Sequence, residues 1–165
     1  MQSSQPATQT FEFDAKSVFE RIFVPIDFSE GSRRALATAL ELRRAFGSEV
    51  HLFRLTESSE NDQFLAGTGA GGMSPQRLVD DAEARLGRFV ENVLPGRSGE
   101  VIVHAQVGVD VVHGIARNAK RFGTTLVLLA KEPKETMFRT QIEKLVQALD
   151  SAVMLLRAPH EPPAS

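Results

Sequence analysis

Short apolar segments alternate with helical patterns from Arg21 onward, and this alternation restricts the fold of the chain more than any other feature. Several segments are nearly continuous runs of Val, Ile and Leu, as expected for strands buried on both faces. Helices between successive strands favour a mostly parallel sheet, because a parallel pair needs a long crossover connection. We therefore predict an α/β protein with helices on both faces of a sheet, and with strands at residues 22–27, 49–55, 100–106, 125–130 and 152–157.

Four amphipathic helices are predicted between these strands, since apolar residues recur every three or four positions over residues 35–46, 78–93, 111–122 and 138–149. Ser29 and Ser74 are suited to cap two helix starts, and Gly47 to end the first helix. Pro25 conflicts with this pattern. It lies inside the first strand candidate, where its missing N–H predicts an edge strand or a bulge.

The length of 165 residues predicts one domain, at residues 11–159, with disordered tails at residues 1–10 and 160–165. The segment Phe11–Glu20 is apolar enough to pack on this domain as an extra element. The connection Thr56–Met73 contains several glycines, but it lacks the Gly-Lys-Ser/Thr ending of a phosphate-binding loop. We interpret it as a mobile surface loop.

Composition excludes several classes of function. The formal net charge is −2, so we expect no nucleic-acid partner, and the absence of cysteine excludes disulfides and thiolate chemistry. We find no run of about 18 apolar residues and no leader peptide, so we expect no membrane association and a cytoplasmic location. Four histidines lack metal-binding spacing, and no catalytic motif is present, so we predict neither a metal site nor an enzyme. His51 and His104 are interpreted as hydrogen-bonded core or interface groups.

Two stretches carry a resemblance to a known family. The run RIFVPIDFSEGS opens a strand–helix–strand unit that ends at Leu55, and the run IEKLVQALDSAVMLLRAP closes the chain after the apolar strand LVLLA. These segments resemble the universal stress protein family. The resemblance implies a three-layer α/β/α fold with the strand order 3-2-1-4-5, the arrangement of adenine nucleotide alpha hydrolase-like proteins.

Open sheets of this order bind ligands beyond the carboxyl ends of the strands where the order reverses, here between the first and fourth strands. The resemblance places Asp27 against the nucleoside part of a bound nucleotide, whereas the residues alone also allow Asp27 to cap the next helix. The candidate nucleotide-binding residues are Ile26, Asp27, Leu55, Gly108, Ala130, Lys131 and Thr140.

The loop after the fourth strand departs from the family pattern. Nucleotide-binding relatives place glycines where this chain has Ala130, Pro133 and Thr140, and the loop is three residues shorter. Pro133 supplies no N–H, and Glu132 and Glu135 add negative charge where phosphate would lie. We therefore predict no cofactor. The alternative is an ATP or AMP sensor, with slow hydrolysis, that uses a non-standard loop.

The last strand candidate predicts a partner. An apolar edge strand is prone to pair with another chain, and the family resemblance implies that two fifth strands join. We predict a homodimer through Val153, Met154, Leu155, Leu156 and Arg157. The preferred function is a dimeric regulatory module of a stress response that binds an unidentified protein.

Overall fold

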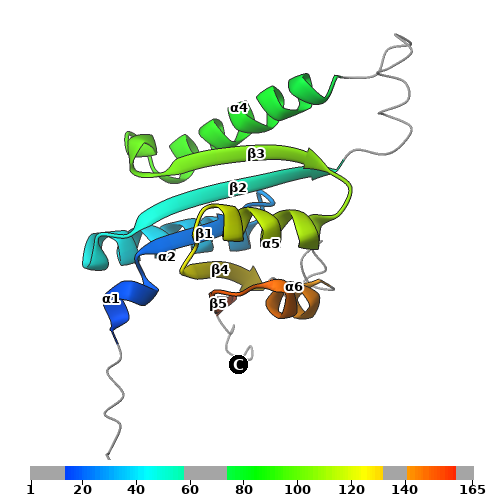
Figure 1. Ribbon diagram of the computed structural model, residues 1–165. Coiled ribbons are helices and arrows are strands. Elements are labelled where there is room, and N and C mark those ends of the chain that lie inside the picture. The colour runs from blue at the N-terminus through cyan, green and yellow to red at the C-terminus, as the bar shows by residue number, and fades with distance from the viewer. Residues whose placement is uncertain (1–13, 58–73, 132–140, 159–165) are drawn as a thin grey trace, which may run out of the picture.

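The computed structural model describes residues 14–57, 74–131 and 141–158 (Figure 1). Strands β1 to β5 form one sheet in the order β3-β2-β1-β4-β5, and all four neighbouring pairs are parallel. The predicted three-layer α/β/α fold and strand order are confirmed. The elements in chain order are α1 (Ala15–Val18), β1 (Arg21–Pro25), α2 (Glu30–Phe46), β2 (Glu49–Glu57), α4 (Pro75–Val93), the 3-10 turn η1 (Ser98–Glu100), β3 (Ile102–Gly108), α5 (Val111–Arg121), β4 (Leu126–Lys131), α6 (Ile142–Ala148) and β5 (Ala152–Arg157).

Two hydrophobic clusters lie on the two faces of the sheet. Helices α2 and α4 cover one face, where Leu36 and Leu86 pack with Val24. Helices α5 and α6 cover the other, where Ile115 and Leu145 join Phe23 in the second cluster. Successive residues of a strand point to opposite faces, so a strand covered on both sides must be apolar throughout. This accounts for the continuous apolar runs in the sequence.

Capping fixes where the helices begin. The side chains of Ser29, Ser74 and Asp110 each accept a hydrogen bond from the backbone N–H three residues further on. Gly47 ends α2 in the left-handed region, at φ 74°, where a side chain would be strained. The predicted caps at Ser29, Ser74 and Gly47 are confirmed.

Pro25 lies in a central strand, as the predicted strand order requires, although a proline within a strand is typical of an edge or a bulge. Strand β1 pairs with β2 up to Pro25, but with β4 only at Ile22 and Phe23. The N–H of Ile26 donates to the carbonyl of Phe53 in β2 at 2.8 Å. Successive N–H groups of a strand face opposite neighbours, so Pro25 faces β4 beyond the end of that pairing. No ladder hydrogen bond is lost there.

Some predicted boundaries and side-chain positions differ from the structure. Strand β3 begins at Ile102 rather than at residue 100, because η1 precedes it and Arg97 forms two hydrogen bonds with the carboxylate of Glu100, at 2.7 and 2.9 Å. Val146, which belongs to the apolar pattern at residues 138–149 and was therefore expected to face the sheet, is 45% exposed. The predicted tails (residues 1–10 and 160–165), residues 58–73 of the predicted loop and Thr140 lie outside the described residues.

The first helix precedes the sheet and contacts the end of α2. Asp14 caps α1, and the ring of Phe19 stacks on Phe46 with centroids 4.6 Å apart. Within the described residues, no helix has the length and apolar character needed to cross a bilayer.

Candidate functional site

The predicted crevice lies where β1 and β4 diverge. Its cavity is only about 10 Å³, much smaller than the 300–1,000 Å³ of ordinary ligand pockets. Of the predicted site residues, Asp27 and Ala130 line it, together with serines at the start of α2. The described lining residues are Pro25, Asp27, Ser29, Ser32, Ala35, Leu129, Ala130 and Ile142.

The other predicted residues within the described part of the chain do not line this cavity. Ile26 is buried in the core beneath α2 and α4, and Lys131 is exposed at the end of β4. Leu55 and Gly108 do lie together, because a Cβ on Gly108 would be 3.2 Å from Cδ1 of Leu55. Leu55 belongs to the cluster beneath α5, where Gly114 approaches it as closely. The structure therefore brings Asp27 together with Ala130, and Leu55 together with Gly108.

Asp27 bonds to the start of α2. Its Oδ1 accepts hydrogen bonds from the backbone N–H of Ser29 at 2.9 Å and from the hydroxyl of Ser32 at 2.6 Å. The Ser32 hydroxyl in turn accepts from the backbone N–H of Asp27 at 3.0 Å. These bonds support the interpretation of Asp27 as a helix-capping residue. They also hold together the β1–α2 turn, whose residues line the crevice.

The sequence pattern did not predict the cluster of arginines and aromatic rings that lies beside Asp27. Phe28 has a φ of 66°, a conformation that costs a residue with a side chain about 1–3 kcal/mol. The guanidinium carbons of Arg54 and Arg85 lie 5.2 and 5.0 Å from the centre of its ring, and Phe89 meets it edge-on. The positive φ of Phe28 and the packing of α4 against β2 bring these residues together. Neither feature can be predicted from a sequence pattern.

Arg54 is half-buried and lies near charged groups of both signs. Its Nη1 donates to the carbonyl of Ile26 at 3.3 Å. Burial lowers the pKa of Arg54, the nearby Asp27 opposes that change, and Arg85 adds to it. Arginine remains charged at neutral pH despite such changes. The carboxyl end of the sheet therefore presents two neighbouring positive charges over an aromatic ring.

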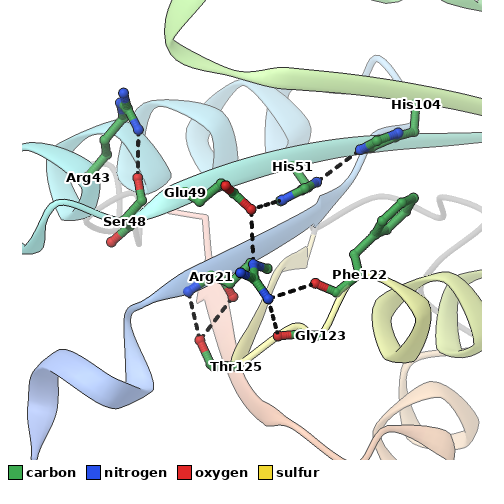
Figure 2. A network of polar contacts seen from close by, with 9 residues as sticks. All are labelled: Arg21, Arg43, Ser48, Glu49, His51, His104, Phe122, Gly123 and Thr125. Atoms are coloured by element: carbon green, nitrogen blue, oxygen red, sulfur yellow. Dashed lines mark hydrogen bonds and ion pairs between the residues drawn. The ribbon is translucent and has the colours of Figure 1, made fainter.

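A second polar group lies at the opposite end of the sheet, where the strands begin (Figure 2). Glu49 Oε1 is 2.9 Å from Nε of Arg21 and 2.6 Å from Nε2 of His51. His51 Nδ1 is 2.9 Å from Nε2 of His104. Arg21 also donates to the carbonyl of Phe122 at 3.2 Å, which ties β1 to the end of α5. The group crosses β1, β2 and β3, and His51 and His104 are hydrogen-bonded as predicted.

The ring of Phe122 packs against the two histidines of this polar group. Its ring stacks on His104 with centroids 4.1 Å apart and on His51 at 5.3 Å. Hydrogen bonding to His51, followed by Arg21, lowers the pKa of Glu49, while burial lowers the pKa of His104. No three histidine, aspartate or glutamate side chains converge as metal ligands in the described ranges.

Comparison with known proteins identifies the family. The model of the universal stress protein family matches residues 19–157. The universal stress protein UspA from Lactobacillus plantarum is 16% identical, with a TM-score of 0.59 over 84% of this chain and 98% of that one. A universal stress protein from Archaeoglobus fulgidus in complex with dAMP is 15% identical, with a TM-score of 0.56 over 84% and 98% of the two chains.

The hypothetical protein MJ0577 is also similar, at 16% identity and a TM-score of 0.62 over 87% of this chain and 99% of that one. No curated protein sequence matches significantly. At these identities the solved structures agree in fold, and the family match covers most of the chain. The chain therefore belongs to the universal stress protein family.

Proposed function

We propose that the chain is a dimeric interaction module of a stress response that works without binding ATP and engages another protein. The observation that carries this proposal is the small volume, about 10 Å³, of the crevice that the described residues line between β1 and β4. A nucleotide needs a pocket of several hundred Å³. The small crevice therefore favours action through the surface over a nucleotide held between β1 and β4.

Two features support a closed crevice. Ala130 adds a Cβ at the position where nucleotide-binding relatives have the first loop glycine, and it lines the cavity. Asp27 is engaged with Ser29 and Ser32, so contact with a nucleoside would require those bonds to be exchanged. A hydrogen bond to a charged group contributes about 1.5–3 kcal/mol, which a nucleotide would have to offset.

The second candidate function is an adenine-nucleotide sensor. The structural relative in complex with dAMP shows that a chain of this fold accommodates a nucleotide. In this chain the arginines around Phe28 supply positive charge next to Asp27, which would suit phosphate oxygens. This candidate requires the β1–α2 turn to open.

Thermal unfolding with nucleotides separates the two candidates. We expect Mg-ATP, ADP, AMP and dAMP at millimolar concentration to shift the Tm of the nucleotide-stripped protein by less than about 1 °C. A ligand at 100 times its dissociation constant would add about 2.7 kcal/mol, or roughly 5–10 °C for a domain of this size. Phosphate release in the same samples tests for slow hydrolysis.

A shift of several degrees with any of these nucleotides would contradict the preferred function. An Arg85→Ala variant would then test the sensor, because this substitution should reduce the shift if the arginines hold the phosphates. An Arg88→Ala variant on the same helix is a matched control, because Arg88 is exposed, whereas the arginines over the Phe28 ring in the described structure are Arg54 and Arg85.

The dimer is proposed to form through β5. Among the described strands, β5 has β4 as its one neighbour, and none of its residues is fully buried. Leu155 is 38% exposed on this edge, where a second copy would cover it and pair with the free backbone groups. A two-fold pairing through Val153–Arg157 gives a closed assembly.

Charge on the β5 edge should separate the subunits. We expect Leu155→Glu to yield monomers in light scattering at low micromolar concentration, where the unmodified protein is a dimer, because two carboxylates would face an apolar interface. Ile102→Glu on the opposite edge is the matched control, since Ile102 is 43% exposed on β3. The interface is wrong if Ile102→Glu dissociates the dimer and Leu155→Glu does not, or if the unmodified protein is monomeric.

A further inference from the structure

The polar group at the start of the sheet has defined hydrogen positions. Glu49 Oε1 lies 2.6 Å from His51 Nε2, and a carboxylate can only accept, so this nitrogen carries a hydrogen. In a neutral ring the other nitrogen then accepts, so His51 Nδ1 receives the hydrogen of His104 Nε2 at 2.9 Å. Figure 2 shows the resulting chain from His104 to Arg21.

Proton uptake has a limit in this arrangement. The pair can hold one added proton, because a single hydrogen still lies between the two facing nitrogens wherever the charge resides. A second proton places a hydrogen on both facing nitrogens, and the bond between the rings is lost. The two rings cannot both be charged while they remain hydrogen-bonded.

The surrounding charges act on the pair from several elements. Arg21 of β1 and Glu49 of β2 form an ion pair at 2.9 Å beside His51, so Arg21 offsets part of the attraction of Glu49 for a charge on His51. Arg121, from the end of α5, acts on His104 as a like charge and opposes its protonation. His51 is itself 7% exposed, so a charge on its ring has little water around it.

The part of β3 that the pair holds is the beginning of an edge strand, which pairs with β2 and packs beneath α4. In the register between the strands, Ile102 lies opposite His51 and His104 lies opposite Phe53. No residue of β3 is fully buried, and Ile102 is 43% exposed. The bond to His51 and the stack on Phe122 therefore add side-chain contacts to the backbone pairing that holds the first residues of this edge strand.

We propose that the His51–His104 pair is an acid-sensitive latch that holds the start of β3 on the sheet at neutral pH and releases it on acidification. Release would uncover Phe122 and the free edge of the sheet beside Ile102. This regulatory role goes beyond the interaction module and does not depend on it, since the latch lies at the opposite end of the sheet from the crevice.

The direction of the pH dependence follows from linkage. Burial lowers the pKa of His104 in the folded protein below its ordinary value of 6.5. The released ring regains that ordinary pKa, so the open state binds more protons. The latch is fully closed above about pH 6.5, and its contribution to stability is lost as the pH falls through the lower pKa of the folded state.

Hydrogen exchange and ring-nitrogen NMR on the full chain test the latch. We expect Nε2–H tautomers at both His51 and His104 at pH 7.5. Below about pH 6.5, the backbone amides of residues 102–105 should lose protection by up to about tenfold per pH unit for each proton taken up, after division by the intrinsic exchange rate. The amides of β5, the other sheet edge, are the internal reference and should keep their protection.

A His104→Gln variant separates the latch from general acid sensitivity. Its amide can donate to His51 Nδ1 without titrating, so we expect most of the acid-dependent loss at residues 102–105 to disappear. His113→Gln is the matched control, because His113 is 85% exposed and pairs only locally with Asp110, and it should behave as the unmodified protein does.

Equal loss of protection in His104→Gln and in the unmodified protein would overturn the proposal. NMR of the unmodified protein tests the latch without any substitution. If His51 and His104 titrate independently near pH 6.5, with tautomers that do not place a hydrogen between the two rings, the latch does not exist.

Discussion

Replacing Phe23 with alanine is expected to lower the free energy of unfolding by about 3–5 kcal/mol, with a fall in Tm of roughly 10 °C. Phe23 is fully buried at the centre of β1, and its ring lies 5.4 Å from that of Phe53 and 6.1 Å from that of Phe122. Alanine would leave a cavity that neighbours on the sheet and on α5 fill only in part. Urea unfolding monitored by circular dichroism measures the loss.

Val109→Ala provides the control for this change. Val109 is 67% exposed just before α5, so its truncation should alter stability by less than about 0.5 kcal/mol. Equal effects of the two substitutions would show that the packing between the sheet and α5 is not the one described.

Asp27→Ala is expected to destabilise the ligand-free protein by about 1–3 kcal/mol, because the N–H of Ser29 and the hydroxyl of Ser32 both lose their acceptor. Asp27→Asn should cost less, since an amide oxygen can still accept both bonds. Urea unfolding at pH 7 measures both variants, and a double-mutant cycle with Ser32→Ala isolates the coupling between the two side chains.

The outcome of this cycle bears on function. A coupling of about 1 kcal/mol or more between Asp27 and Ser32 would support the structural role. If Asp27→Ala instead leaves stability unchanged or raises it, the carboxylate does not serve as a helix cap. That result would favour the nucleotide sensor, because residues retained for ligand binding often cost stability.

Local patterns were sufficient for most of the fold. The fifth strand occupies its predicted residues 152–157, since a short apolar run between helical patterns leaves little choice of boundary. Ser29 and Gly47 bound α2 as predicted, because capping depends on neighbouring backbone groups alone. The strand order rested on the family resemblance, as pairing between distant segments has no local signature.

What the sequence did not predict depends on contacts between distant residues. Pro25 is accommodated by the early divergence of β4 from β1, which its neighbours do not determine. His51 and His104 are 53 positions apart, so their spacing suggested burial but not the bond between the rings. The small volume of the crevice depends on how the side chains of Asp27 and Ser32 are oriented across the β1–α2 turn. The sequence contains both residues but does not specify that orientation.

The strand order also has a consequence for synthesis on the ribosome. Strands β1, β2 and β3 are neighbours in the sheet and lie within the first 108 residues, so they can assemble while the chain is still growing. The other edge of β1 stays unpaired until β4 has been synthesised, because Ile22 of β1 pairs with Leu126 of β4. Until then the apolar edge of a half-built sheet is exposed, a state that favours aggregation. A nascent chain that stalls between β3 and β4 is therefore the form of this protein most in need of a chaperone.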